Sequence, residues 1–270
     1  MLVAAFISGT YELWVYFTIL GDERLYLLLS IVIYYFTPNI SNGLLLISSV
    51  LISGSINISL KYIFNLPRPP DPLVQVEGPG FPSGHAQITS SFWSAKSLIY
   101  KKNALSALAL IIILGVSISR VYLRAHYLHD VFWGAVLGIL IGLACYGVST
   151  FSVKRDFYMP FISLQAFVLT LSIINLSFLS GDKHASSSLV GLSAAVLLTV
   201  VFCRGQLKES SPGGPLLRGV LSAASSLLLL ATHYYTLGVD VFIRSACFFL
   251  SGLLVFLLPF ALMSYSKRAQ

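Results

Sequence analysis

The sequence predicts an all-α protein, a polytopic transmembrane helical bundle of about nine spans. Hydrophobic residues make up 56% of the 270-residue chain and charged residues only 10%, whereas about 25% of the residues in a soluble domain are charged. Apolar runs close to the roughly 20 residues that a helix needs to cross a bilayer recur along the whole chain. The chain does not show the alternating segments of about 10 residues that build a transmembrane barrel. We therefore expect an integral membrane protein of the helical class.

Nine apolar runs qualify as spans, separated by turn-forming or charged residues. They cover residues 24–37, 42–63, 85–100, 104–121, 127–150, 158–180, 187–203, 216–236 and 241–264. The N-terminal segment, residues 1–21, lacks a basic start and a small-residue cleavage site and contains Glu12, so it is not typical of a cleaved signal peptide. We expect it to remain as an interfacial or membrane helix.

Basic residues gather at one set of span ends, which predicts the orientation. They are Lys101, Lys102, Lys154, Arg155, Arg204, Lys208, Arg218, Lys267 and Arg268, with only Asp156 and Glu209 among them. By the positive-inside rule this side is cytoplasmic. The net charge of +7 is therefore interpreted as topology, and no nucleic-acid partner is expected. The opposite connections, which include residues 64–84 and 121–126, should face the extracytoplasmic or lumenal side of a plasma membrane or endoplasmic reticulum.

The connection between the second and third spans is dense in polar chemistry. It reads "KYIFNLPRPPDPLVQVEGPGFPSGH" from 61 to 85, and its prolines rule out a continuous helix because each removes a backbone donor. Lys61 ends the preceding helix and Arg68 lies in the loop. Arginine offers a planar fork to phosphate oxygens and lysine a compact charge. The two side chains can therefore converge on one anion.

The same connection ends in "FPSGH", where the next helix should start. Ser83 and Gly84 then occupy a helix N-terminus, whose free NH groups and positive dipole end suit a bound phosphate. His85 follows directly, within reach of that anion.

A second polar cluster, "SRVYLRAHYLHD", covers residues 119–130. His126 and Asp130 are four residues apart and therefore share one face of a helix. A carboxylate there can hold one imidazole nitrogen protonated, which leaves the other as a free lone pair. We expect His129 on a different face, as an interfacial or structural residue. For Arg124 two roles stay open: a contact with the membrane surface, or a contact with a second, distal phosphate.

Three motifs in this order resemble the type 2 phosphatidic acid phosphatase (PAP2) superfamily. Residues 61–69 read KxxxxxxRP, residues 82–85 read PSGH, and residues 119–130 read SRxxxxxHxxxD. The resemblance covers roughly residues 22–150 and implies a catalytic helical core there. No motif is recognised in residues 158–270, which we expect to form appended transmembrane helices, as in the glucose-6-phosphatase and sphingosine-phosphate phosphatase branches.

The resemblance implies a metal-independent phosphatase that uses no cofactor. His126 resembles the nucleophile that becomes a phosphohistidine, Asp130 the residue that orients it, and His85 the general acid that protonates the leaving oxygen. The residues that it implies for phosphate binding are Lys61, Arg68, Ser83, Gly84, Ser119 and Arg120. In-line phosphoryl transfer needs this combination of a nucleophile, an acid and cations on the equatorial oxygens.

The expected substrate is a lipid phosphate, first of all a polyprenyl diphosphate, with membrane lipids around the protein. Sphingoid phosphates, phosphatidate-type lipids and a sugar phosphate stay as alternatives. The motifs contact only the phosphate, so they leave the substrate and the oligomeric state open.

Two other classes of protein remain as alternatives. His85, His126, His129 and Asp130 could form a zinc-type site, although three cations beside a metal ion would then be unexplained. A transporter is disfavoured because the spans hold almost no charge apart from Lys96. The three cysteines, Cys145, Cys203 and Cys247, lie in apolar runs without metal-binding spacing and are expected to be small buried hydrophobes.

Overall fold

The computed structural model describes residues 2–179, 182–209 and 211–268, without the side chains of residues 2–9 and 265–268. The helices of this part of the chain are α1 (Leu2–Ile19), α2 (Glu23–Phe36), α3 (Ile40–Phe64), α4 (Gly84–Tyr100), α5 (Asn103–Tyr122), α6 (Leu128–Arg155), α7 (Met159–Ile174), α8 (Lys183–Cys203), α9 (Pro215–Tyr235) and α10 (Val241–Arg268). A π-helical turn, η1 (Asn175–Leu179), extends α7, and a 3-10 turn, η2 (Arg204–Gln206), follows α8. These described segments contain no strand, and the predicted all-α class is confirmed.

The predicted spans coincide with helices α2 to α10. Seven of the described helices are long and apolar enough to cross a membrane, namely α3, α5, α6, α7 with η1, α8, α9 and α10. The other two, α2 with 14 residues and α4 with 17, are shorter, roughly 21 and 26 Å at 1.5 Å per residue. The polytopic bundle is confirmed, with nine as an approximate number of spans.

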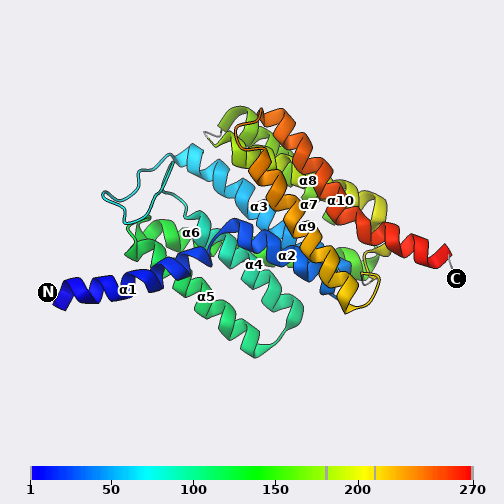
Figure 1. Cartoon of the computed structure of the whole chain (residues 1–270), viewed down its shortest axis with the longest axis horizontal. Helices are drawn as coiled ribbons and strands as arrows, with labels where there is room; N and C mark the ends of the chain where they lie inside the picture. The colour runs from blue at the N-terminus through cyan, green and yellow to red at the C-terminus, as the bar shows by residue number, and fades with distance from the viewer. Residues whose placement is uncertain (1, 180–181, 210, 269–270) are drawn as a thin grey trace.

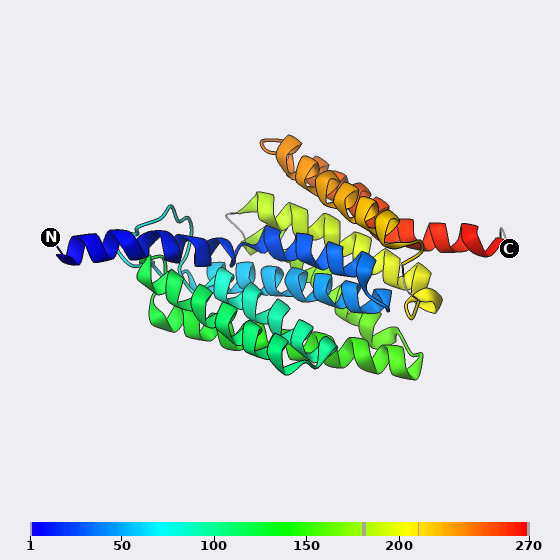
Figure 2. The ribbon, with the colours of Figure 1, turned by 60° about the horizontal axis from the view of Figure 1, so that its bottom comes forward.

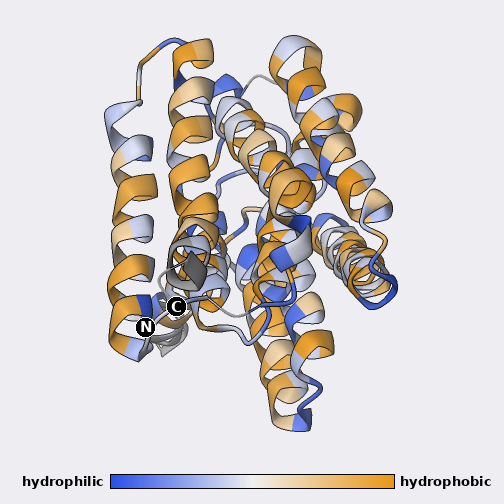
Figure 3. Cartoon of the chain, turned by 90° about the vertical axis from the view of Figure 1, so that its right-hand side faces the viewer, coloured by the Kyte–Doolittle hydropathy of each residue, from blue (hydrophilic) through white to orange (hydrophobic). Residues whose placement is uncertain are grey.

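Helix α3 forms the centre of the bundle (Figures 1 and 2). Its most apolar 18-residue stretch is 83% buried, against 22% for α5 and α9. It contacts α2, α4, α6, α7 and α8. Hydrophobic colour runs along most of the helical ribbons in Figure 3, and hydrophilic colour gathers mainly at helix ends and connections. This distribution is the one expected of helices surrounded by lipid.

Helix α6 packs along α4 through a row of small residues. Gly134, Gly138 and Gly142 lie one turn apart and face α4: a Cβ at Gly134 would stand 2.6 Å from the Ser83 carbonyl oxygen, and a Cβ at Gly138 would overlap the Gln87 carbonyl. Small residues at this spacing let two membrane helices approach closely. The row fixes the start of α4 against the start of α6, where the second and third motifs lie.

The C-terminal helices join the core through buried polar contacts. On α3, Ser55 Oγ lies 2.8 Å from Ser172 Oγ of α7, and Ser59 Oγ donates to Asn175 Oδ1 of η1 at 2.7 Å. Tyr34 of α2 donates to the Phe256 carbonyl of α10 at 2.6 Å. Hydroxyl and amide groups of this kind join helices within a membrane. The division into residues 1–21, 22–150 and 158–270 remains a proposal.

Arg244 holds the ends of the last three helices together. It is 1% exposed, and its guanidinium donates to the His184 carbonyl (3.2 Å), Ser188 Oγ (3.2 Å) and Thr236 Oγ1 (2.9 Å). A further nitrogen lies 3.2 Å from His233 Nδ1. These contacts tie the starts of α8 and α10 to the end of α9, so we interpret Arg244 as a structural residue.

Candidate active site

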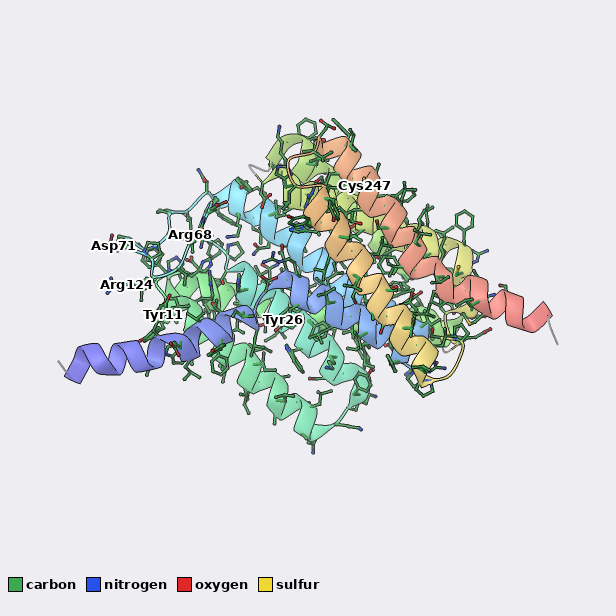
Figure 4. The ribbon with its side chains drawn as sticks, viewed as in Figure 1. Tyr11, Tyr26, Arg68, Asp71, Arg124 and Cys247 are labelled. Carbon is green, nitrogen blue, oxygen red and sulfur yellow. The ribbon has the colours of Figure 1, made fainter. Side chains whose placement is uncertain are left out.

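The three motifs meet at one end of the bundle. Lys61 is on the last turn of α3, Arg68 lies in the loop after it, and His85 is on the first turn of α4, while Arg120 is on the last turn of α5. Figure 4 shows Arg68 beside this loop, at the same end of the molecule as Arg124 and the N-terminal helix. The Ser83 NH donates to the Asp130 carbonyl at 3.0 Å. This bond joins the second and third motifs directly.

The His126 imidazole lies between a carboxylate and a guanidinium. It is 3% exposed, with Nδ1 3.6 Å from Asp130 Oδ2 and Nε2 3.1 Å from Arg68 Nη1. A guanidinium can only donate, so Nε2 is the acceptor and the proton of the neutral ring is on Nδ1, facing Asp130. The lone pair that a nucleophile needs is therefore on Nε2, on the side of Arg68.

Asp130 is held in place by the turn that carries His126. It is fully buried, and its Oδ2 accepts from the Tyr127 NH at 2.9 Å as part of a capping box at the start of α6. A carboxylate in the first turn is also favoured by the helix dipole. Asp130 can thus orient His126 because the helix start fixes its own position.

The positions of the other cations indicate an anion site. Lys61 Nζ donates to the Pro79 carbonyl at 2.7 Å, and Arg120 is 6% exposed with a buried Nε that has no hydrogen-bond partner in the described structure. Across the described residues, none of Lys61, Arg68 and Arg120 has a carboxylate within 4.0 Å. Buried positive charge without a counter-ion is costly, so an anionic ligand would stabilise this site.

The start of α4 offers fewer backbone donors than the sequence suggests. The Ser83 NH is occupied by Asp130, so its phosphate contact would have to come from Oγ, which is buried and unpartnered in the described structure. Gly84 begins the helix, where NH groups lack an intrahelical acceptor. A Cβ at Gly84 would stand 3.0 Å from Asn57 Oδ1, and Asn57 donates to the Pro82 carbonyl at 3.2 Å. No motif singled out Asn57, yet it holds the PSGH turn against α3.

Ser119 and His85 both lie against the N-terminal segment. Ser119 Oγ donates to the Val116 carbonyl at 2.7 Å and lies 3.3 Å from Thr18 Oγ1, which suits a supporting contact. The His85 ring is half-buried, and a Cβ at Gly21 would stand 2.9 Å from its Cδ2.

His129 is closer to the site than its position in the sequence suggested. Its Nε2 lies 3.0 Å from Asp130 Oδ1 although the side chain is 57% exposed, and its ring stacks on that of Tyr127 with 5.4 Å between centroids. His126 thus faces one oxygen of the Asp130 carboxylate, Oδ2, and His129 faces the other, Oδ1. His129 stays largely exposed, which accords with an interfacial or structural residue; its contact with Asp130 was not predicted.

The alternatives find less support in this geometry. Within the described residues, no group of three or more His, Cys, Asp or Glu side chains is placed to share one metal ion. The intramembrane cation Lys96 stands over the Trp93 ring, 4.6 Å from its centroid. This contact accounts for Lys96 without a permeation path.

The environment of His126 predicts the pH dependence of the reaction. Burial lowers the pKa of His126 to about 4; Asp130 acts in the opposite direction, and the positive charges of Arg68, Lys61 and Arg120 add to the lowering. The imidazole therefore stays neutral until the pH falls to about 4. We expect kcat/KM, corrected for the second ionisation of the substrate near pH 6, to keep its value well below pH 6 and then to fall. Asp130→Asn should move that fall to lower pH, and a fall centred at or above the ordinary histidine value would contradict the neutral buried nucleophile.

The fold and the site together define a polytopic helical membrane protein with a buried histidine beside cations that lack a carboxylate partner in the described structure. The family model of the PAP2 superfamily matches residues 42–154, a segment that contains all three motifs. The chain thus carries a PAP2 superfamily segment, and this supports a phosphatase function. No curated protein and no solved structure matches the chain. Helices α1, α2 and α7 to α10 lie outside the matched segment.

Proposed function

We propose that the protein hydrolyses a lipid phosphate, with a polyprenyl diphosphate as the first candidate, through a phosphohistidine on His126. One observation carries this proposal: the Nε2 lone pair of the buried His126 points at Arg68, 3.1 Å away, and Arg68, Lys61 and Arg120 all lack a carboxylate partner in the described structure. A phosphoryl group held by those cations would lie directly against the nucleophile.

In the first step, His126 Nε2 attacks phosphorus and the bond to the leaving oxygen breaks. Arg68 moves from Nε2 onto a phosphoryl oxygen, where Lys61 and Arg120 neutralise the remaining charge. His85, protonated at this stage, gives its proton to the leaving oxygen. The imidazole is now a phosphorylated cation, and Asp130 stabilises its Nδ1 proton.

In the second step, water attacks phosphorus from the side that the leaving group has vacated. His85 accepts a proton from the water, the N–P bond breaks, and inorganic phosphate leaves. The cycle returns His85 protonated and His126 neutral. These steps need no metal ion and no cofactor, which accords with a metal-independent hydrolase.

The surroundings of the site support a lipid substrate. Ile63 and Phe64, on the last turn of α3, are 60% and 52% exposed, and Phe132 and Trp133, near the start of α6, are 58% and 49% exposed. Large apolar side chains that flank a polar site at the ends of spans suit a headgroup bound with its tail in the bilayer. A soluble sugar phosphate does not need such a surface.

A substrate panel tests this proposal. We expect kcat/KM for a polyprenyl diphosphate to exceed that for glucose 6-phosphate by roughly 100-fold, which corresponds to burial of only three or four methylene groups at about 0.8 kcal/mol each. Phosphatidate and a sphingoid phosphate are measured in the same detergent, each with and without a chelator. Glucose 6-phosphate as the best substrate would exclude the lipid proposal, and loss of activity in chelator, restored by zinc, would exclude the metal-independent one.

A variant of Arg124 tests whether the site binds the second phosphate of a diphosphate. It is exposed and has a left-handed backbone, with φ +53°, so it can reach outward from the anion site. If it binds a distal phosphate, Arg124→Ala should lower kcat/KM for the diphosphate and leave the monophosphates unchanged. An equal effect on both classes would remove that role.

We propose further that the site faces the extracytoplasmic or lumenal side. The basic residues from which the orientation was predicted lie at the other end of the bundle, where Lys208 pairs with Asp156 at 3.2 Å. Of these residues, Lys267 and Arg268 have side chains outside the described part of the structure. In a background without the three native cysteines, a cysteine at the exposed position Gln75 should react with an impermeant thiol reagent in intact cells. Cysteines at Asn103 and Arg155, equally exposed, should be protected. The reverse pattern would place the site in the cytoplasm.

A further inference from the structure

We infer that helix α1, which lies outside the family segment, completes the phosphate site, and that Thr18 is a positioning residue for Arg120. This inference rests on the proposed function, because Arg120 is taken to bind the phosphoryl oxygens. It gives the N-terminal segment a part in the site in addition to a place in the membrane.

Helix α1 packs against the end of α5 that carries the third motif. The rings of Trp14 and Tyr122 lie 5.4 Å apart, and a Cβ at Gly115 would overlap the Phe17 ring. Further along, a Cβ at Gly21 would stand 2.8 Å from Val116 Cγ1. The two helices therefore run antiparallel in close contact, which brings Thr18 level with Arg120.

In the described structure, the Thr18 hydroxyl holds the guanidinium of Arg120. Arg120 Nη1 donates to Thr18 Oγ1 at 2.8 Å, while Nε is buried and unpartnered in the described structure. Thr18 Oγ1 also lies 3.3 Å from Ser119 Oγ. Ser119 Oγ has a single proton and lies closer to the Val116 carbonyl, at 2.7 Å, so the bond from Arg120 is the main contact of the Thr18 hydroxyl. An arginine that is anchored through one nitrogen keeps the others aimed at the anion, and a free one would lose this orientation to side-chain rotation.

The contact explains the polarity of this part of α1. Thr18 is half-buried between the apolar residues Phe17 and Ile19, so the packing of α1 on α5 alone would be served by an aliphatic side chain. The hydroxyl is instead placed at hydrogen-bonding distance from a buried cation. Three separate elements then hold the cations of the site: α3 and its loop carry Lys61 and Arg68, and α1 aims Arg120 on α5.

The test separates positioning from packing with three single variants. Thr18→Val keeps the shape of the side chain and removes the hydrogen-bond acceptor, whereas Thr18→Ser keeps the acceptor. Thr199→Val is the control, because it makes the same change at a buried threonine of α8. The Thr199 hydroxyl donates within its own helix, to the Ala195 carbonyl at 2.8 Å. Two quantities are measured on the purified full chain: kcat/KM for the best lipid phosphate, and the affinity for inorganic phosphate from the concentration dependence of the melting temperature.

We expect Thr18→Val to lower both kcat/KM and phosphate affinity about tenfold, the size of effect expected for a hydrogen bond to a charged group. Thr18→Ser and Thr199→Val should stay within about twofold of the wild type, and the melting temperature of Thr18→Val without phosphate should be unchanged. In an Arg120→Met background, Thr18→Val should have no further effect, because residues that act through one interaction are not additive.

The outcomes distinguish the inference from the function on which it rests. If the protein hydrolyses lipid phosphates and Thr18→Val binds phosphate like the wild type, the inference is wrong and the function stands. If phosphate binding depends on Thr18 and no substrate is hydrolysed, the function is wrong and the positioning role stands. Thr18→Val could instead lower kcat/KM and phosphate affinity equally in the Arg120→Met background, or only in step with a lower melting temperature. Either result would show that Thr18 contributes only to packing.

Discussion

Replacing His126 by alanine is expected to abolish hydrolysis, with kcat/KM falling by about five orders of magnitude, as for other removed nucleophiles. The imidazole is buried, and its Nε2 lone pair faces Arg68 at 3.1 Å, on the side where the phosphoryl group is proposed to bind. Of the other histidines at this end of the bundle, His85 lies against Gly21, and His129 lies on the exposed side of Asp130.

The measurement is the covalent intermediate itself. Wild-type protein mixed briefly with radioactive phosphate substrate should carry an acid-labile, base-stable label, and His126→Ala should carry none. His184→Ala is the matched control, since this exposed histidine contacts Arg244 only through its backbone carbonyl. Asp130→Asn should leave a small residue of activity, because Nε2 keeps its lone pair while the orientation of the ring is lost. Label that persists in His126→Ala would exclude this nucleophile.

The residues of the site could be predicted from sequence because each belongs to a motif at the end of a span. Lys61, His85 and Arg120 must lie at one membrane surface once the spans alternate in direction. The spacing of His126 and Asp130 predicted that they meet, but on one face of a helix; in the structure His126 lies in the turn before α6 and only Asp130 belongs to the helix. Their mutual distance, 3.6 Å between Nδ1 and Oδ2, could not be predicted, because it depends on how the turn before α6 is capped.

The contacts that position the site depend on packing between distant segments, and local patterns do not contain this information. The row of Gly134, Gly138 and Gly142 fits α6 against α4, but glycines are common in membrane helices and the row names no partner. Asn57 and Thr18 carry no motif, and their roles appear only when α3 meets the PSGH turn and α1 meets α5. The contact of His129 with Asp130 was also not predicted, since the spacing did not show that two histidines approach one carboxylate at the start of α6.

The length of helix α4 shows a second limit of the hydropathy pattern. Residues 85–100 were expected to form a span, and the helix found there, Gly84–Tyr100, has 17 residues with Gln87, Thr89, Ser90 and Ser91 all buried. Hydropathy detects apolar composition, whereas α4 is enclosed by α2, α3, α5 and α6 and faces protein more than lipid. A helix in that position can be shorter and more polar than one that contacts the bilayer.

Replacing Arg68 by lysine is expected to lower kcat/KM by about 100-fold to 1000-fold although the charge is kept. The guanidinium donates to the carbonyls of Glu77, Gly78 and Ala125 at 2.7, 2.8 and 2.9 Å and also reaches His126. It thereby ties the loop after α3 to the turn that carries the nucleophile. The single ammonium of lysine cannot reproduce a planar fork, so the loop and the nucleophile would lose their common anchor.

The kinetic constants and the phosphate affinity of Arg68→Lys should therefore fall together, with a melting temperature only slightly lower. Arg155→Lys, an exposed arginine at the opposite end of the bundle, serves as the control and should match the wild type. Arg68→Met removes a positive charge that lowers the pKa of His126, so the acidic fall in kcat/KM should also move to higher pH. Wild-type kinetics in Arg68→Lys would mean that charge alone holds the phosphate, and the geometric link between loop and nucleophile would then have no part in catalysis.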